Sequence, residues 1–261
     1  MPTTVSEVAR ASSCAIAVMA KASIPGRSKT RLVPPLSAEE AALFNTAFLR
    51  DIADNILAAS QTVEIAGYAA FGPPNSRPFF ESTLPAEVGL IEAWLPNFGD
   101  CLFAAVRELL HCGYGSAVVL NSDSPTLPTS LLVETATVLR RDGDRIVLGP
   151  AQDGGYYLLG VKAAHRRLFD DIAWSTAQVA QQTLDRAAEL GLSVHVLPTW
   201  YDVDDVGSLR LLHTELLEDG SFAPELRPNQ ARHTQLLLQE LTESAQLSDR
   251  LNSEAFAGAA E

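Results

Sequence analysis

Short apolar runs along this chain alternate with longer segments in which apolar residues recur at every third or fourth position. Runs rich in Val, Ile, Leu and Ala are typical of strands buried on both faces of a sheet, and a period near 3.6 is typical of amphipathic helices. We therefore predict an α/β fold with a mostly parallel sheet between helices. The strands are expected near residues 14–20, 63–70, 88–94, 117–120, 145–150, 158–161 and 193–197.

The longest amphipathic segment begins at Ser37, where Ser-Ala-Glu-Glu is a capping-box pattern. Phe44, Phe48, Ile52 and Ile56 lie on one stripe of this predicted helix, so they are expected to face the core. Shorter helices are expected at residues 79–84, 101–111, 128–139, 175–190 (with Ser175 or Thr176 as its N-cap) and 208–217.

The pattern divides the chain into three parts. Residues 1–12 are small and polar and are predicted to be disordered. Residues 13–217 are predicted to form a single domain that contains the catalytic core. The composition then changes, prolines interrupt the chain, and a polar helix around Leu236–Leu241 is expected. We predict that residues 218–261 form an appendage outside the catalytic core, for packing, dimerisation or closure over the site.

Composition and charge narrow the possible partners. The chain has 261 residues, a formal net charge of -13 and 47% hydrophobic residues. Such an acidic protein has no overall attraction for nucleic acid or for an anionic membrane, so an anionic ligand needs a local basic site. The three cysteines, Cys14, Cys101 and Cys112, form neither a metal-binding spacing nor a disulfide framework, which fits a reducing cytoplasm. No apolar run approaches the roughly 18 residues of a membrane span.

A basic loop follows the first predicted strand. Four cations lie between Lys21 and Arg31, and Pro25-Gly26 provides a turn. We predict that Lys21, Lys29, Arg31 and the backbone at Gly26 bind phosphates. The alternatives are a solvated loop and, for Arg31, a structural salt bridge. Lys29 is expected to have little structural role, because its neighbours in sequence are polar. The loop matches neither the P-loop nor the dinucleotide-binding pattern.

Acidic residues follow two of the predicted strands. Asp123 comes directly after the buried run 117–120, and carboxyl ends of parallel strands are where open α/β sheets bind ligands. A single Asp there can hold a divalent cation that bridges phosphate oxygens, although it can also simply cap the next helix. Asp202 and Asp204 lie in Asp-Val-Asp-Asp and point to one side if the chain is extended, so they are a second source of metal ligands.

A third acidic position is Asp153, which precedes Gly154-Gly155-Tyr156-Tyr157. Two glycines after an Asp permit a tight turn and the close approach of backbone to a ligand. A hairpin turn accounts for the same residues without any ligand. The sequence leaves these two interpretations open.

Five motifs in order resemble a known group of proteins. They resemble a GT-A type nucleotide-diphospho-sugar transferase domain and, more closely, a bacterial family of uncharacterised GT-A-like transferases often labelled as glycosyltransferases associated with radical-SAM enzymes. The resemblance covers about residues 13–217. The motifs are A-K-x-x-x-P-G-x-x-K-T-R-L (20–32), S-D-S-P-T-L (122–127), L-G-P-A-Q-D-G-G-Y-Y-L-L-G (148–160), W-S-T (174–176) and W-Y-D-V-D (200–204).

Some of these motifs are also similar to 2-phospholactate guanylyltransferase and to the molybdenum-cofactor nucleotidyltransferases, which share the fold but transfer a nucleotide. The metal motif of glycosyltransferases is D-x-D, and here Asn121 takes its first position, so only Asp123 remains as a strong ligand. One carboxylate after the fourth strand, with a second near the C-terminal end, is more typical of the nucleotidyltransferases. Conversely, the guanylyltransferase pattern has Thr-Asn after the glycines, where this chain has Tyr156-Tyr157.

The resemblance implies an enzyme that uses Mg²⁺ or Mn²⁺, bound by Asp123 with Asp202 or Asp204, to transfer a group from a nucleotide donor to a small acceptor. Asp153 is then the expected acceptor-side base. Gly154, Gly155, Tyr156 and Trp174 are expected to bind the acceptor, although at least one of the two tyrosines is expected in the core.

Three functions remain open. We expect a glycosyltransferase that uses a nucleotide sugar. The first alternative is a nucleotidyltransferase that uses an NTP, and the second is a catalytically silent nucleotide-binding subunit. The retained acidic residues Asp123, Asp153 and Asp204 argue against the last. A homodimer is possible.

Overall fold

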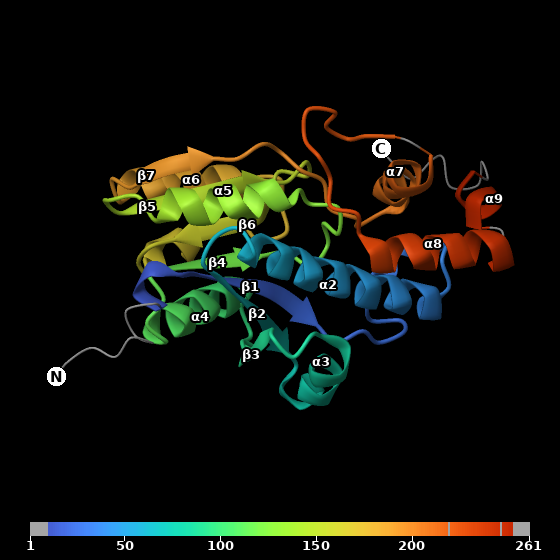
Figure 1. Ribbon diagram of the computed structural model, residues 1–261, viewed down its shortest axis with the longest axis horizontal. Coiled ribbons are helices and arrows are strands. Elements are labelled where there is room, and N and C mark those ends of the chain that lie inside the picture. Colours follow the sequence, from blue (N-terminus) through green and yellow to red (C-terminus); the bar gives the residue numbers. More distant parts are fainter. Residues whose placement is uncertain (1–9, 219, 246, 253–261) are drawn as a thin grey trace.

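The computed structural model of the protein describes residues 10–218, 220–245 and 247–252. Its centre is a seven-stranded sheet of order β3-β2-β1-β4-β6-β5-β7 (Figure 1). All neighbouring strands are parallel except β6, which runs antiparallel to β4 and β5. The predicted mostly parallel sheet is therefore confirmed. The strands are β1 (Cys14–Lys21), β2 (Ile65–Gly72), β3 (Gly89–Glu92), β4 (Ser116–Leu120), β5 (Arg145–Pro150), β6 (Tyr156–Val161) and β7 (Ser193–Val196).

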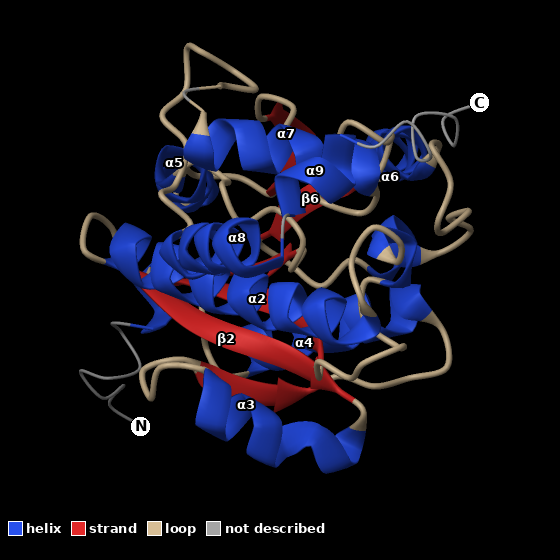
Figure 2. Cartoon of the chain, turned by 90° about the vertical axis from the view of Figure 1, so that its right-hand side faces the viewer, coloured by secondary structure: helices blue, strands red, loops and turns tan. Residues whose placement is uncertain are grey.

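Helices cover both faces of this sheet (Figures 1 and 2). The α-helices are α2 (Ala38–Ser60), α3 (Arg77–Thr83), α4 (Phe98–His111), α5 (Thr129–Leu139), α6 (Val179–Glu189), α7 (Val206–Leu217), α8 (Arg232–Ala245) and α9 (Leu247–Asn252). Short 3₁₀ helices are η1 (Thr30–Leu32), η2 (Pro74–Ser76) and η3 (Arg166–Phe169). One core cluster joins α2, α5, α7 and α8 to the sheet, and a second joins α4 and α6 to its other face.

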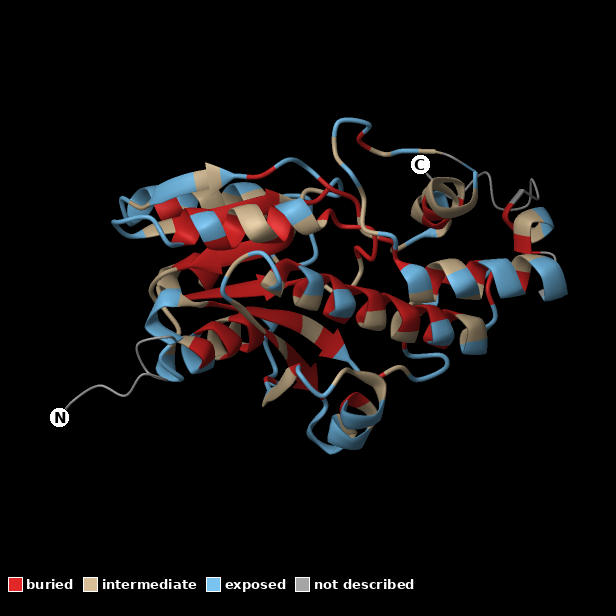
Figure 3. Cartoon of the chain, viewed as in Figure 1, coloured by how far each residue is buried: buried red, intermediate tan, exposed pale blue. Residues whose placement is uncertain are grey.

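Strand β1 shows why the sequence forms this sandwich. Ile16 and Val18 belong to the cluster under α2, whereas Ala15 and Ala17 belong to the cluster under α4, and all four residues are buried. Figure 3 shows the central strands mostly in the colour of buried residues. Successive side chains of a strand point to opposite faces, so a strand that is apolar at every position must be covered on both. The described residues include no helix long and apolar enough to cross a membrane.

Most predicted helix starts agree with the structure, with one clear exception. The capping box of α2 is present, since the Ser37 hydroxyl accepts a hydrogen bond from the Glu40 N–H at 3.1 Å. The prediction that Ser175 or Thr176 caps a helix is wrong, because α6 begins only at Val179. Ser175 has a φ of 64°, and the Thr176 hydroxyl donates to the Ala173 carbonyl at 2.7 Å. These two residues therefore form a turn in front of the helix.

The described part of the segment after residue 218 packs into the hydrophobic core, and packing is one of the three roles predicted for it. Leu238, Leu241, Leu247 and Leu251 are buried in the same cluster as the sheet and α2. Figures 1 and 2 both show α8 lying alongside α2. Alternation of polar residues with a few leucines could not reveal this, since the face that the leucines cover is formed by another helix.

Polar contacts also join this segment to the rest of the chain. The carboxylate of Asp51, a buried residue of α2, accepts hydrogen bonds from the backbone N–H groups of His233 and Thr234 at 2.8 and 2.9 Å. It thereby satisfies donors at the start of α8 that have no partner within the helix. The Asn229 side chain donates to the Pro125 carbonyl at 3.1 Å, just beyond Asp123. Residues 1–12 were predicted to be disordered. Residues 1–9 lie outside the described residues, and the prediction is wrong for residues 10–12, which are helical.

Candidate active site

Two adjoining pockets open where β1 and β4 end and β6 begins. We call them the loop pocket, of about 370 Å³, and the hairpin pocket, of about 620 Å³. The loop pocket is bounded by the basic loop after β1, and the hairpin pocket by the β5–β6 turn. Residues that line both are Met19, Lys21, Arg31, Phe98, Asn121, Asp123 and Asp204. Because the parallel strands end on the same edge of the sheet, the chain brings these distant segments together.

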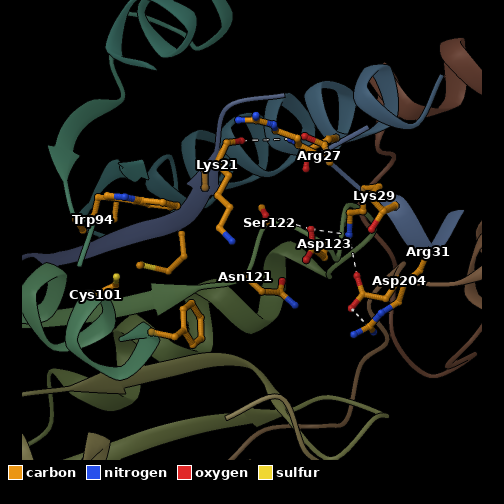
Figure 4. Close-up of a pocket in the computed structure, with 18 residues that line it drawn as sticks. Lys21, Arg27, Lys29, Arg31, Trp94, Cys101, Asn121, Ser122, Asp123 and Asp204 are labelled. Carbon is orange, nitrogen blue, oxygen red and sulfur yellow. Dashed lines mark hydrogen bonds and ion pairs between the residues drawn. The ribbon is translucent and has the colours of Figure 1, made fainter. Parts of the chain in front are cut away.

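The loop pocket gathers the cations that the sequence singled out. Lys21, Arg27, Lys29 and Arg31 all line it (Figure 4). The Lys21 ammonium lies 5.7 Å from the centre of the Trp94 ring. The remaining predicted member, Gly26, does not line the pocket. Its φ of 73° turns the loop, and the space beside its Cα is open.

Lys29 occupies a different position from the other three cations. Its side chain is only 6% exposed, and its ammonium lies 2.7 Å from Asp123 Oδ1 and 2.9 Å from Asp204 Oδ1 (Figure 4). It also donates to the Val203 carbonyl at 2.8 Å. The expectation that Lys29 has little structural role is therefore wrong. Sequence neighbours could not show this, because the partners of Lys29 come from the other end of the chain.

The electrostatics at Lys29 follow from these contacts. Burial lowers the pKa of Lys29, but attraction to Asp123 and then to Asp204 outweighs it, and the pKa is raised overall. Arg31 differs, since its side chain is 76% exposed and its guanidinium is 4.0 Å from Asp204. At that exposure and distance an ion pair contributes little to stability, so Arg31 keeps its charge available to a ligand.

Asp123 is positioned by the end of β4. The Ser122 hydroxyl donates to Asp123 Oδ1 at 3.1 Å, and the Asp123 carbonyl accepts from the Val203 N–H at 2.8 Å. Asp123 does not cap α5, whose N-cap position is Pro128, without a side-chain hydrogen bond. The helix-cap alternative for Asp123 is therefore excluded, and the carboxylate faces both pockets.

Asp202 and Asp204 approach the same place from an extended segment before α7. Val203, between them, is fully buried, so the two carboxylates point toward the pockets as the alternation predicted. The pKa of Asp202 is raised to about 7, first by burial and then by the negative charges of Asp153, Asp204 and Asp123. Burial and the neighbouring carboxylates thus both disfavour the ionised form of Asp202.

No group of three or more His, Cys, Asp or Glu side chains in the described part of the chain is arranged to hold a metal by itself. A nucleotide-bound Mg²⁺ needs less, because it takes one or two protein carboxylates and completes its shell with phosphate oxygens and water. Asp123 and Asp202 supply hard oxygen donors of this kind beside the cations of the loop pocket. Lys29 binds Oδ1 of both Asp123 and Asp204. Asp204 is the poorer candidate, since its Oδ2 also lies 4.0 Å from Arg31, whereas Asp123 Oδ2 has no cation partner among the described residues.

The turn between β5 and β6 forms the wall of the hairpin pocket. The hairpin is confirmed, and the carboxylate of Asp153, an exposed residue, accepts from the Gly155 N–H at 2.8 Å. Gly154 does not face the pocket, contrary to the prediction. A Cβ there would lie 2.3 Å from the Ala177 carbonyl oxygen, so this glycine permits the hairpin to pack against the turn before α6.

Aromatic side chains complete the hairpin pocket. Trp174 packs edge-on against Tyr156 and Phe98, with ring centres 6.4 and 5.3 Å apart. The Tyr156 hydroxyl is buried and has no hydrogen-bond partner among the described residues, and the same holds for Asn121 Oδ1. Tyr157 is instead fully buried and donates to the Pro198 carbonyl at 3.0 Å. The expectation that one tyrosine lies in the core is confirmed.

Sequence reasoning missed several residues that line these pockets. They are Arg27, Trp94, Phe98 and the side chain of Asn121. Arg27 belongs to the basic loop and could have been included with its neighbours. Trp94 and Phe98 are 45% and 52% exposed, and their sequence signal is weak because aromatic residues near a strand end are usually core.

The raised pKa of Asp202 predicts that the stability of the protein depends on pH, which can be tested with a variant. A carboxyl whose pKa rises on folding stabilises the fold below its unfolded value near 3.8, and this stabilisation is lost as the pH rises through about 7. At pH 8 without divalent cations, Asp202→Asn should raise the free energy of unfolding by about 1–3 kcal/mol, after allowance for solvent screening, and the Tm by about 3–8 °C. At pH 5, about one unit above the unfolded value, the difference should fall to roughly 40% of its size at pH 8.

Thermal melts at the two pH values measure this effect. Added Mn²⁺ should raise the Tm of the wild type more than that of the variant. The matched control is Asp185→Asn, which changes an exposed carboxylate of α6 bonded to Gln181 and should leave the Tm nearly unchanged. If Asp202→Asn is less stable than the wild type at pH 8, the ionised Asp202 carboxylate does not destabilise the fold.

Residues 55–176 match the model of a family described as "Uncharacterized protein conserved in bacteria (DUF2064)". We call residues 55–176 the DUF2064 segment. The DUF2064 segment contains Asp123, Asp153 and Trp174 but neither the basic loop nor Asp202 and Asp204. The basic loop therefore lies before the DUF2064 segment, and Asp202 and Asp204 lie after it.

Solved structures show which fold surrounds the DUF2064 segment. The chain is similar to a "putative nucleotide-diphospho-sugar transferase" from Desulfovibrio desulfuricans G20, with a TM-score of 0.75 and 26% identity over 88% of this chain and 95% of that chain. It is also similar to CMP:2-keto-3-deoxy-manno-octonic acid synthetase complexed with CTP, with a TM-score of 0.50 and 11% identity over 79% and 99% of the two chains. No curated protein matches the chain. The fold is that of the nucleotide-diphospho-sugar transferases.

Proposed function

We propose that the protein is a glycosyltransferase that moves a sugar from a nucleotide-diphospho-sugar to a hydroxyl group of a small acceptor without a phosphate. The observation that carries this proposal is the charge of the hairpin pocket. Of its described lining residues, those absent from the loop pocket include the carboxylates Asp153 and Asp202 but no Lys or Arg.

This distribution separates the two enzyme types. A nucleotidyltransferase that joins an NTP to a phosphorylated acceptor must hold a second anionic group, and proteins bind phosphate with Arg, Lys and backbone N–H groups. A phosphate placed beside Asp153 would instead meet a like charge. A sugar or other polyol suits the pocket better, since its hydroxyls donate to carboxylates and its C–H face packs on Trp174.

The loop pocket suits the donor. Its exposed cations, Lys21, Arg27 and Arg31, are placed to pair with a diphosphate, and Trp94 and Phe98 provide aromatic surface beside them. The similarity to a described nucleotide-diphospho-sugar transferase supports the same donor.

The proposed reaction needs one proton acceptor and stabilisation of one leaving group. Asp153 takes the proton of the acceptor hydroxyl as its oxygen bonds to the anomeric carbon, and the bond from that carbon to the diphosphate breaks. Lys21 and Arg31, which reach both pockets, stabilise the nucleoside diphosphate as it leaves. Mg²⁺ or Mn²⁺, held by Asp123 and Asp202, would add charge neutralisation at the same oxygens.

One observation favours nucleotidyl transfer as the second candidate. Asn121 replaces the first carboxylate of the D-x-D motif, so β4 is followed by the single acid Asp123. The other candidate metal ligands, Asp202 and Asp204, come from the segment before α7. A CTP-bound synthetase shares the fold, although at 11% identity this likeness shows the fold alone.

A substrate panel tests these candidates together. The full-length protein is incubated with nucleotide sugars or NTPs, with Mn²⁺ or Mg²⁺, and with acceptors in matched pairs such as glycerol and glycerol 3-phosphate. Release of a nucleoside diphosphate, faster with the unphosphorylated acceptors and stopped by EDTA, is the expected result. Pyrophosphate release with phosphorylated acceptors would identify a nucleotidyltransferase. Nucleotide binding without any turnover would identify a silent subunit.

A further inference from the structure

The Lys29 ammonium joins three segments that are far apart in the sequence. Lys29 lies in the loop after β1, Asp123 follows β4, and Val203-Asp204 precede α7. An ammonium has three N–H donors, and here three acceptors are within 2.9 Å: Asp123 Oδ1, Asp204 Oδ1 and the Val203 carbonyl. Lys29 thus has no donor left for a phosphate unless one of these contacts breaks.

The remaining cations of the loop pocket are in the opposite situation. Lys21 and Arg27 are exposed and have no carboxylate within ion-pair distance among the described residues. Figure 4 shows the Lys21 side chain extending toward Asn121 and Ser122, whereas Lys29 points to Asp123 and Asp204. Phosphate binding was predicted for the whole loop. Lys21 and Arg27 remain free for this role, whereas Lys29 does not.

The position of Lys29 is that of a bridging cation. Two carboxylates from different strand ends converge on one positive charge that is 6% exposed, and a backbone carbonyl completes the oxygen cage. Its backbone is held in the left-handed region, with φ 49° and ψ 43°, which non-glycine residues seldom adopt. Such a conformation persists when the surrounding contacts determine it.

We propose that Lys29 is a positioning residue that acts as a built-in cation, holding the Asp123 and Asp204 carboxylates together in place of a second metal ion and leaving one divalent cation to bind between Asp123 and Asp202. This inference rests on the proposed function for the role of that divalent cation. Lys29 then does not bind the donor phosphates, which fall to Lys21, Arg27 and Arg31.

The test replaces the cation by an apolar side chain of similar length. In Lys29→Met without divalent cations, the two carboxylates face each other unpaired, and the Tm should fall by about 6 °C or more. Mn²⁺ should then occupy the vacated position. Its affinity without nucleotide, measured by titration of free Mn²⁺ in EPR spectra, should increase about tenfold or more over the wild type. Added Mn²⁺ should restore most of the lost Tm.

Lys21→Met is the matched control, since it removes one positive charge from the same pocket without unpairing a carboxylate. Its Tm should stay within about 2 °C of the wild type and its Mn²⁺ affinity within about threefold. A Lys29→Met protein with an unchanged Tm, or one that Mn²⁺ stabilises no more than the wild type, would overturn the proposal. If Lys29→Met fails to fold, the stability of the double variant Lys29→Met/Asp204→Asn tests the proposal instead. It should fold, because only one carboxylate remains, and equal instability of this double variant would overturn the proposal.

A separate measurement distinguishes this inference from the proposed function. With saturating Mn²⁺ and at low salt, Lys29→Met should bind UDP within about threefold of the wild type, whereas Lys21→Met should lose about tenfold. If Lys29→Met loses as much UDP affinity as Lys21→Met, then Lys29 binds phosphate, and the proposed difference in role between the two lysines is refuted. If the wild type binds neither UDP nor other nucleoside diphosphates, the proposed function fails, while the Tm and Mn²⁺ results still decide the role of Lys29.

Discussion

Asp123→Asn should lower kcat/KM about a thousandfold, which corresponds to about 4 kcal/mol of transition-state stabilisation. Asp123 faces both pockets, lies 2.7 Å from Lys29 and is the only described carboxylate directly after β4. The substitution keeps the side-chain shape but removes the charge that would hold a divalent cation beside the donor diphosphate. Steady-state kinetics with the donor and acceptor from the panel, well below the Tm, measure the effect.

Asp100→Asn is a matched control for this variant. The Asp100 side chain is 32% exposed against 29% for Asp123, and it also pairs with a cation, Arg166, but outside the two pockets. Turnover of this control should stay within about twofold of the wild type, as for other surface substitutions. Full turnover in Asp123→Asn, or a wild-type reaction that EDTA leaves unchanged, would show that Asp123 does not bind an essential metal.

Removing residues 219–261 should prevent stable folding. The truncation would expose the core surface under Leu238, Leu241, Leu247 and Leu251 and would leave the Asp51 carboxylate without its backbone donors. Burial of a leucine contributes about 2 kcal/mol, so the loss of these four contributions, about 8 kcal/mol, is comparable to the whole stability of about 5–15 kcal/mol of a typical domain. The sequence alone predicted an appendage outside the catalytic core, whose removal would leave that core folded.

Two leucines of α8 make this prediction quantitative. Leu238 is fully buried, whereas Leu236 on the same helix is 55% exposed. Leu238→Ala should lower the free energy of unfolding by about 2–5 kcal/mol, and Leu236→Ala by less than about 0.5 kcal/mol. Denaturant unfolding of both variants measures the difference. Equal effects of the two substitutions, or a folded truncated protein that binds nucleotide, would show that the segment is the separate appendage expected from its composition.

Local patterns were sufficient for most of the fold. A strand covered on both faces must be apolar at every position, and β1 and β4 satisfy this, so their existence and burial could be predicted. The capping box at Ser37 set the start of α2 in the same way. The start of α6 was misplaced, because Ser175 and Thr176 have the chemistry of caps but close a turn instead.

The candidate site was predictable where it depends on the ends of strands. Parallel strands place their carboxyl ends at one edge, so Asp123 and the basic loop after β1 were expected to meet there, and both line the loop pocket. The alternation in Asp202-Val203-Asp204 correctly placed both acids on the side opposite the buried Val203. The glycine pair was only half understood, since Gly155 lines the hairpin pocket while Gly154 packs against Ala177.

The sequence by itself determined that this protein has an α/β sandwich with acidic strand ends facing a basic loop, because these features depend on residue types at short, regular spacings. Only the tertiary structure decided which charges pair. Lys29 is 174 residues from Val203 and 175 from Asp204, and Asp51 is 183 from Thr234. Electrostatic energy depends on distance and burial rather than on order along the chain, so the role of Lys29, the raised pKa of Asp202 and the place of the C-terminal segment in the core emerge only when the chain is folded.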